Sequence, residues 1–247
     1  MAPYNPIIVA LDVDSTARAL ALADELKGAV GAVKVGSQLF TAAGPDIVRR
    51  LAERGHRVFL DLKYHDIPNT VAGAAAEAAK LGAWMFDVHA SGGESMMKAA
   101  RESSHAAAVH AGVTPPLVIA ITVLTSFDQN TLGTIGVHRE VLEQVDALSW
   151  LAEAAGLDGV VASPHEVTRL RAMRRPGFAL VTPGIRAAVL GEAGHRHDDQ
   201  ARTMTAGAAV TAGATFIVVG RPIIAAPDPR KAAEALAIET GVTSPKR

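Results

Sequence analysis

Short runs of aliphatic and β-branched residues alternate along this chain with longer stretches rich in Ala, Leu, Glu and Arg. The first pattern is typical of buried strands, and the second is typical of helices with one apolar face. We therefore expect eight strands. They lie near Ile7–Asp12, Ala32–Gly36, Val58–Lys63, Trp84–His89, Leu117–Leu124, Gly159–Ser163, Phe178–Thr182 and Thr215–Gly220.

Helices are expected between these strands, and one more is expected after the last strand. Several of them would end at a glycine in the C′ position, where a left-handed backbone closes the last turn. These glycines are Gly55, Gly82, Gly112, Gly156 and Gly213. The expected helices are Thr16–Lys27, Pro45–Arg54, Pro68–Leu81, Glu94–His110, Arg139–Ala155, His165–Arg174, Thr205–Ala212 and about Asp228–Ile238.

Eight strand–helix units in 247 residues predict an α/β fold of the (β/α)₈ barrel type, with residues 1–247 as a single domain. The polar end, 241–247, is expected to fray. The alternative is a doubly wound open sheet, which usually carries a glycine-rich phosphate turn after its first strand. The segment Asp12–Thr16 contains no glycine, so the barrel is favoured.

The composition limits the class of protein. Hydrophobic residues make up 49% of the chain and aromatic residues only 4%, so Ala and the larger aliphatic residues must fill the core. A net charge of −1 gives no reason to expect nucleic acid or an anionic membrane as a partner. The absence of cysteine excludes disulfides and thiolate chemistry. With no signal-peptide pattern and no apolar run of membrane-spanning length, we expect a cytoplasmic enzyme.

Charged residues stand near the carboxyl ends of the first three predicted strands. Asp61 and Lys63 are two apart on one strand and should share a face, while Asp12 and Lys34 belong to the two strands before it. Buried charges of this kind are costly unless they pair with one another. A structural ion pair would satisfy that need, but three consecutive strands with the same feature favour an active site.

The loops after the seventh and eighth strands form the usual phosphate site of such barrels. Here they contain Arg186 and Arg221, each close to a glycine that allows the backbone to approach an oxyanion. The polar loop from Ala187 to Thr203 is expected to act as a lid over a bound phosphate. Two surface arginines beside ordinary turns would be the alternative.

The stretch Phe59–Val71, FLDLKYHDIPNTV, closely resembles the signature of the orotidine 5′-phosphate decarboxylase family, which performs the last step of UMP synthesis. This long signature is specific, whereas the phosphate blocks alone are shared with many barrels. Further blocks resemble the family's in the same order along nearly the whole chain: Leu11-Asp12, Val33–Gly36, Val88–Ala90, Leu124–Ser126, Thr182–Arg186, Asp199-Gln200 and Val219–Pro222.

The resemblance implies a cofactor-free reaction in which orotidine 5′-monophosphate loses carbon dioxide to give UMP. Lys63 would be the proton donor to C6 of the pyrimidine, and Asp61 would face the substrate carboxylate. Asp12 and Lys34 would contact the ribose hydroxyls, with Lys34 also in the charge network. No metal is implied.

The resemblance also implies a homodimer in which Asp66 and Thr70 enter the neighbouring subunit's active site, with Asp66 counted among the catalytic residues. The other implied substrate-binding residues are Thr125 and Ser126 at the pyrimidine edge, and Pro183, Arg186, Gln200, Gly220 and Arg221 at the phosphate end.

Two residues depart from the family's pattern. Tyr64 stands where Phe is usual, and Asp87 stands where Asn is expected before Val-His-Ala. Neither is expected to touch a residue assigned to the chemistry.

Three alternatives remain open at this point. A hexulose-phosphate synthase shares the Asp-x-Lys-x-x-Asp pattern but uses magnesium and lacks the His-Asp-Ile-Pro-Asn-Thr continuation. A barrel that binds a nucleotide without turning it over would tolerate loss of Lys63. A metal site could use His65, His89, His195 and His197, although the last two lie in the predicted lid and His89 is expected to form hydrogen bonds at the end of its strand.

Overall fold

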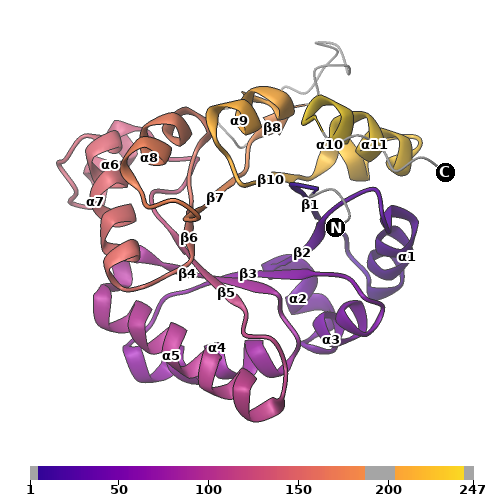
Figure 1. The fold of residues 1–247 in the computed structure, drawn as a ribbon, viewed down its shortest axis with the longest axis horizontal. Helices are drawn as coiled ribbons and strands as arrows, with labels where there is room; N and C mark the ends of the chain where they lie inside the picture. Colours follow the sequence, from indigo (N-terminus) through magenta and orange to yellow (C-terminus); the bar gives the residue numbers. More distant parts are fainter. Residues whose placement is uncertain (1–4, 187–203, 242–247) are drawn as a thin grey trace.

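The computed structural model describes residues 5–186 and 204–241. Within these residues, eight parallel strands close into a barrel in the order β1-β10-β7-β6-β5-β4-β3-β2 (Figure 1). The predicted (β/α)₈ fold is therefore confirmed and the open sheet is excluded. The barrel strands are β1 Ile7–Ala10, β2 Ala32–Gly36, β3 Val58–Tyr64, β4 Met85–His89, β5 Leu117–Ile121, β6 Gly159–Val161, β7 Ala179–Thr182 and β10 Phe216–Val219.

Helices surround the barrel in the described part of the chain. The eight longer predicted ones are found close to their expected bounds, but the short α2, α6 and α10 were not anticipated, nor was the small pair β8 Ile185–Arg186 and β9 Met204–Thr205. The helices are α1 Thr16–Leu26, α2 Ser37–Ala43, α3 Asp46–Glu53, α4 Pro68–Lys80, α5 Glu94–Ala111, α6 Gln129–Thr134, α7 Val141–Ala154, α8 Val167–Met173, α9 Ala206–Ala212, α10 Arg221–Ile224 and α11 Pro229–Glu239, with 3₁₀ turns at Ala90–Gly92 and Pro164–Glu166.

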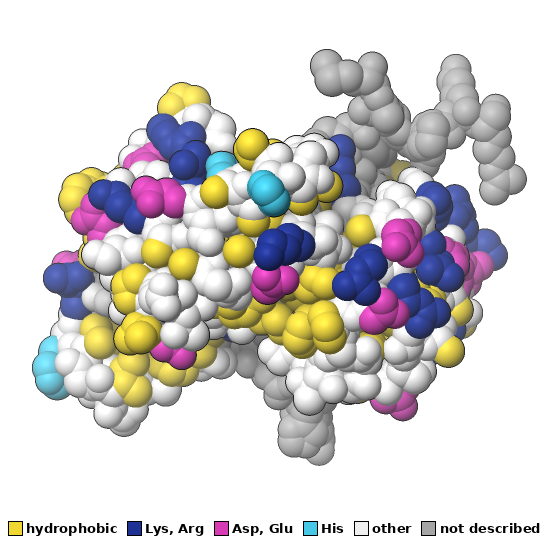
Figure 2. All heavy atoms as spheres, turned by 90° about the horizontal axis from the view of Figure 1, so that it is seen from below, with side chains coloured by type: hydrophobic (Ala, Val, Ile, Leu, Met, Phe, Trp, Pro, Cys, Tyr) yellow, Lys and Arg dark blue, Asp and Glu magenta, His cyan; other side chains and the backbone are white. Residues whose placement is uncertain are grey.

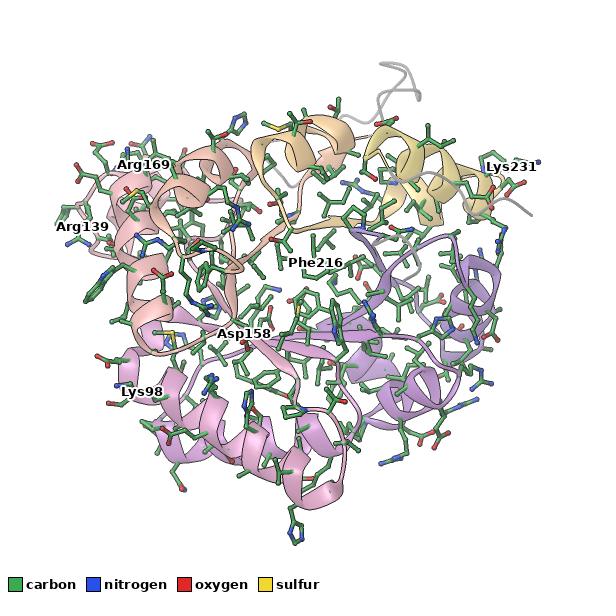
Figure 3. The ribbon with its side chains drawn as sticks, viewed as in Figure 1. Lys98, Arg139, Asp158, Arg169, Phe216 and Lys231 are labelled. Carbon is green, nitrogen blue, oxygen red and sulfur yellow. The ribbon has the colours of Figure 1, made fainter. Side chains whose placement is uncertain are left out.

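Successive side chains along each barrel strand point alternately to the two faces of the sheet, and this divides the core into two parts. One set of side chains faces the helices and forms the larger cluster, as expected for strands that are buried on both faces. The other set fills the barrel interior, where Phe216 points toward the centre (Figure 3). This interior cluster consists of Ile8, Ala32, Phe59, Met85, Ile119, Ala179, Val181 and Phe216.

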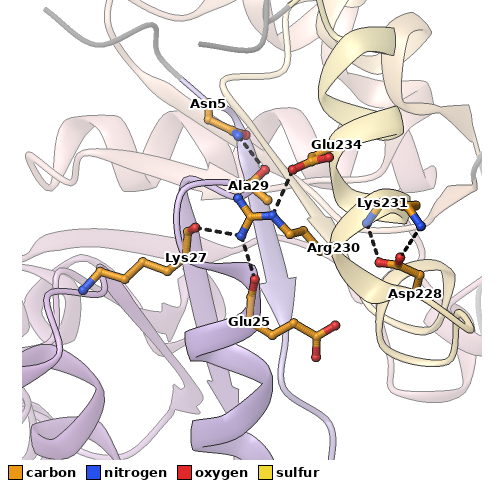
Figure 4. Close-up of polar contacts among 8 residues, drawn as sticks. All are labelled: Asn5, Glu25, Lys27, Ala29, Asp228, Arg230, Lys231 and Glu234. Carbon is orange, nitrogen blue, oxygen red and sulfur yellow. Dashed lines mark hydrogen bonds and ion pairs between the residues drawn. The ribbon is translucent and has the colours of Figure 1, made fainter. Parts of the chain in front are cut away.

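The first and last units of the barrel are joined by polar contacts as well as by the β1–β10 ladder. Arg230 of α11 donates to the backbone oxygen of Glu25 at 2.9 Å and to that of Lys27 at 3.3 Å (Figure 4). These two carbonyls lie at the end of α1, where helical acceptors lack partners within the helix. Asp228 caps the start of α11 by accepting from the backbone N–H of Lys231.

The surface shows no concentration of one charge in the view of Figure 2. Basic and acidic side chains are interspersed there, and hydrophobic side chains gather in a hollow near its centre. Among the described helices, none is both long and apolar enough to cross a membrane.

Candidate active site

Four charged side chains from the ends of β1, β2 and β3 meet at one end of the barrel. The ammonium of Lys34 lies 3.1 Å from Asp61 Oδ2 and 3.4 Å from Asp12 Oδ1. The ammonium of Lys63 forms an ion pair with the other carboxylate oxygen, Asp61 Oδ1. The predicted pairing of these residues is therefore present, with Asp61 between the two lysines.

Burial makes these pairs electrostatically strong. Lys34 is only 8% exposed. Burial lowers its pKa, but the charges of Asp61 and Asp12 more than compensate and raise it above the ordinary value. Burial likewise raises the pKa of Asp61, while Lys34, a hydrogen bond with Asp87 and Lys63 together bring it well below the usual range. Asp61 is therefore an anion at neutral pH and Lys34 a cation.

Gly36 leaves the space that the ammonium of Lys34 occupies. A Cβ built on this glycine would lie 2.9 Å from Lys34 Nζ and 3.5 Å from Asp12 Oδ1. A side chain at this position would crowd the ammonium of Lys34, which would have to shift. The glycine that ends β2 is therefore part of how the strand presents Lys34.

Lys63 lies on an irregular part of β3. Among the described residues it is the one non-glycine with a positive φ, 53°. The register shifts here, because Leu60 pairs with Phe86 and Tyr64 pairs with Val88, so β3 contains extra residues between these pairs. Asp61 and Lys63 meet as expected, but the direction of Lys63 depends on this irregular backbone as well as on strand alternation. A bulge of this type re-aims a side chain and is frequent beside active sites.

Asp87 corrects a second expectation, that it touches no residue of the chemistry. Its Oδ1 accepts a 2.8 Å hydrogen bond from the backbone N–H of Lys63, and its carboxyl is within hydrogen-bonding reach of Asp61. Asp87 is 0% exposed, and burial together with the negative charge of Asp61 raises its pKa well above the usual range. The available signal in the sequence was a single acid within the apolar run of β4. It was not recognised as a candidate because the candidates were chosen at strand ends.

The other departure, Tyr64, is set back from the ion pairs. Its ring packs against Phe86 at 6.0 Å between centroids. Burial, with a smaller contribution from Asp87, raises the pKa of Tyr64 to about 12. The phenol is therefore neutral over the physiological range.

Two histidines stack beside the cluster. The rings of His65 and His89 are 5.2 Å apart and 28° from parallel. Burial lowers the pKa of His89, and the nearby His65 and Lys63 lower it further. The described residues contain no group of three side chains that could hold a metal ion, while His195 and His197 lie outside the described residues.

The segment after β3 turns outward. Asp66 and Thr70 are both exposed, and Asp66 accepts from the backbone N–H of Ile67 at 2.6 Å. Within the described chain Asp66 pairs with no cation and does not join the cluster around Asp61. Ile67 beside it is 66% exposed.

The phosphate end is only partly described. Gly220 lies near the cluster, because a Cβ built there would be 3.9 Å from Asp12 Oδ2. Arg221 follows as the first residue of α10 and is exposed. The backbone of Arg186 pairs with Thr205, and Pro183 precedes this pair. The predicted lid 187–203, with Gln200, and the residues 242–247 lie outside the described residues.

Thr125 and Ser126 follow β5 on a loop. The predicted strand Leu117–Leu124 ends earlier than expected, at Ile121, so both residues lie beyond the ladder. Thr125 is half-buried and Ser126 is exposed. Both are therefore at the same end of the barrel as the charged cluster.

Comparison with known proteins agrees with this geometry. The model of the orotidine 5′-phosphate decarboxylase / HUMPS family matches residues 5–236. Curated orotidine 5′-phosphate decarboxylases from Syntrophotalea carbinolica and Moorella thermoacetica are each 50% identical to this chain. The alignments cover 94% and 95% of this chain, and 93% and 92% of the two relatives.

Solved structures give the same result. Orotidine 5′-phosphate decarboxylase from Lactobacillus acidophilus is 39% identical, with a TM-score of 0.83, over 95% of this chain and 98% of that one. An uncharacterised conserved protein from Geobacillus kaustophilus is 37% identical, with a TM-score of 0.81, over 95% of this chain and 99% of that one. The family expected from the signature is thus confirmed, and the chain belongs to the orotidine 5′-phosphate decarboxylase / HUMPS family.

Proposed function

We propose that this protein is an orotidine 5′-phosphate decarboxylase, a carboxy-lyase that converts orotidine 5′-monophosphate to UMP and carbon dioxide in pyrimidine biosynthesis. The observation that carries the proposal is Asp61 held between Lys34 and Lys63. Relatives 50% identical over almost their whole length bear the decarboxylase name. The family match alone would not select this activity, because the family also includes a second group of proteins, named HUMPS.

The reaction needs a cation at the reacting carbon. Breaking the C6–carboxylate bond releases carbon dioxide and leaves an electron pair in the plane of the ring, without conjugation to a carbonyl. We assign Lys63 the role of stabilising this charge and then transferring a proton to C6. The ion pair with Asp61 fixes the position of this ammonium in the site.

Asp61 is assigned a place beside the substrate carboxylate. Two anions at close range repel, and this repulsion ends when carbon dioxide leaves, so the contact disfavours the bound substrate relative to the transition state. The depressed pKa of Asp61 keeps the carboxylate ionised for this role. Asp12 and Lys34 are assigned to the ribose hydroxyls, which is consistent with their direct contact.

Binding of the phosphate is assigned to the far end of the site. Gly220, Arg221 and Arg186 follow the last two barrel strands, where oxyanion sites of this fold are usual. Pro183 and Gln200 complete this end, and Thr125 and Ser126 would contact the pyrimidine edge. Binding energy from the phosphate, remote from C6, would support desolvation of the charged cluster.

A homodimer would complete each site. Asp66 and Ile67 directly precede α4 and Thr70 lies in its first turn, and all three are exposed and accessible to a partner subunit. We assign Asp66 to the partner's Lys63, where a second carboxylate would flank the ammonium. The same proposal includes a single-domain chain acting in the cytoplasm, without a cofactor.

The experiment that tests the function is ultraviolet-monitored turnover of orotidine 5′-monophosphate by purified protein in EDTA. Conversion to UMP with the chelator present is the expected result. A folded protein that leaves this substrate unchanged in EDTA, and accepts phosphosugars only with added magnesium, would instead be a hexulose-phosphate synthase. Binding of UMP without any turnover would identify a catalytically silent barrel.

A further inference from the structure

Asp87 lies in the barrel interior directly beneath the catalytic cluster. On β4 it follows Met85 of the interior cluster by two positions and therefore faces the same way. Its Oδ1 accepts from the backbone N–H of Lys63. Its Oδ2 is buried and receives no hydrogen bond from any donor among the described residues, although the carboxyl of Asp61 is within reach. Two ionised carboxylates cannot bond to each other, because neither has a proton to donate.

Lys63 is the one cation of the described structure that acts on Asp87, and its charge lowers the pKa of Asp87 by less than burial and Asp61 raise it. Asp61 already pairs with both Lys34 and Lys63. The other titratable groups that face Asp87 are Tyr64 of β3, which is neutral, and His89 of its own strand, whose pKa is lowered. The strand on its other side, β5, carries no titratable residue. An ionised Asp87 would therefore be a fully buried anion that shares the cation Lys63 with a second anion, Asp61.

We propose that Asp87 is a positioning residue that holds a proton, donates it in a hydrogen bond to Asp61, and anchors the backbone N–H of Lys63 with its other oxygen. This inference rests on the proposed function for the roles of Asp61 and Lys63. One side chain would thus orient the carboxylate that faces the substrate and hold Lys63 in the left-handed backbone that aims its ammonium. The site therefore depends on a neutral acid that itself touches no substrate.

Two substitutions separate the hydrogen bonds from the packing. Asp87→Asn retains both bonds, because the amide oxygen accepts from Lys63 and the amide nitrogen donates to Asp61. Asp87→Leu has a similar size and removes both. We expect Asp87→Asn to keep kcat within about threefold of wild type and Asp87→Leu to lower kcat by about 100-fold, the size of loss that small misplacement of a catalytic group causes, with KM little changed.

Two kinetic outcomes would overturn the proposal. If Asp87→Asn were as impaired as Asp87→Leu, the ionised carboxylate would be required. If folded Asp87→Leu retained wild-type kcat, Asp87 would position nothing. Circular dichroism of both variants shows whether they fold, and Asp87→Asn remains informative even if Asp87→Leu does not fold.

The location of the proton is measured independently of turnover, by denaturant unfolding of wild type and Asp87→Asn at fixed protein concentration between about pH 5 and 8. In wild type, burial and Asp61 raise the folded pKa of Asp87, so the folded state keeps a proton that the unfolded state releases above the ordinary aspartate value of 3.8. Stability is therefore lost as pH rises toward the folded pKa.

We expect the unfolding equilibrium constant of wild type, relative to that of Asp87→Asn, to increase by up to about tenfold per pH unit in this window. Parallel pH curves for the two proteins would show an ionised Asp87 and overturn the proposal. Absence of decarboxylation by wild type would overturn the proposed function instead, and the unfolding curves would still locate the proton.

Discussion

At the residue scale, the cluster shows how several charges are held in a barrel interior. Lys34 and Asp61 are nearly buried, and each would be very costly alone. Their mutual contact, with Lys63 and Asp12 on the outer sides, leaves neither without a counter-ion. Well-packed apolar residues at these positions would often give a more stable protein. The charges are therefore better explained by a role in binding or catalysis than by a role in stability.

This view predicts the effect of Asp61→Asn on stability. The folded-state pKa of Asp61 is depressed. The stability that its ionised carboxylate contributes is therefore present above the unfolded-state pKa near 3.8 and is lost as pH falls below that value. At pH 7 we expect a loss of about 3 kcal/mol, since the buried Lys34 loses its main partner. The difference from wild type should shrink as pH falls below about 4, because unfolded wild type then binds a proton at Asp61 that the folded protein does not.

The matched control is Asp46→Asn, whose exposed pair with Arg49 is worth at most about 0.5 kcal/mol. Denaturant unfolding at pH 7 and at acidic pH measures both variants. If the difference in unfolding free energy between Asp61→Asn and wild type stayed constant down to strongly acidic pH, the electrostatic account would be contradicted.

Sequence reasoning located this cluster for a clear physical reason. Asp12, Lys34 and Asp61 interrupt apolar runs near strand ends, and parallel strands in a barrel bring those ends together. The bulge at Lys63 was not predictable from its own strand, because register depends on how β3 pairs with β4. Asp87 was undervalued for the same reason, since its contact with Lys63 exists only because of that bulge.

At the scale of elements, the eight helices with a clear pattern or terminal signal were predictable, and α2, α6 and α10 were not. A helical stretch followed by glycine identified α3, α4, α5, α7 and α9, and the predicted glycines have positive φ. The short helices α2, α6 and α10 contain too few turns to show a period, whereas α9, with seven residues like α2, was marked by Gly213 at its end. Their existence depends on the loops into which they fold.

The alanine-rich α4 packs closely along α5. The two helices approach closely enough for Ser103 Oγ of α5 to donate to the backbone oxygen of Ala72 at 2.8 Å. Ala100 lies one turn before Ser103 on α5 and is 0% exposed. Small side chains on this face are therefore needed for the approach.

Enlarging such a residue should destabilise the protein. We expect Ala100→Leu to lower the free energy of unfolding by about 1–3 kcal/mol through overpacking. Ala106→Leu, at an exposed position of the same helix, should change it by less than about 0.5 kcal/mol. Thermal or denaturant unfolding measures both, and equal effects of the two substitutions would show that the α4–α5 contact tolerates larger residues.

At the scale of the whole molecule, one chain presents an incomplete site on this account. Asp61, Lys63 and Lys34 are together, while Asp66 from the same signature is turned outward with the exposed Ile67. A closed two-fold dimer would place each Asp66 beside the other chain's Lys63. Strand patterns could not reveal this, because they describe contacts within one chain.

Subunit mixing tests the shared site. Lys63→Ala and Asp66→Asn should each be nearly inactive alone. After denaturation and refolding of an equal mixture, half of the dimers are hybrid and each hybrid has one intact site, so activity should recover to about a quarter of wild type. Recovery no greater than the sum of the two separate variants would contradict a site built from two chains.

The central claim is that the ammonium of Lys63 carries the decarboxylation, and the rate constant of Lys63→Ala tests it most directly. Turnover of saturating orotidine 5′-monophosphate should fall by at least about 100-fold relative to wild type, since both charge stabilisation and proton transfer are removed. Lys80→Ala, which removes an exposed lysine paired with Glu77, serves as the control and should keep wild-type turnover. A folded Lys63→Ala protein that decarboxylates the substrate at the wild-type rate would contradict the account.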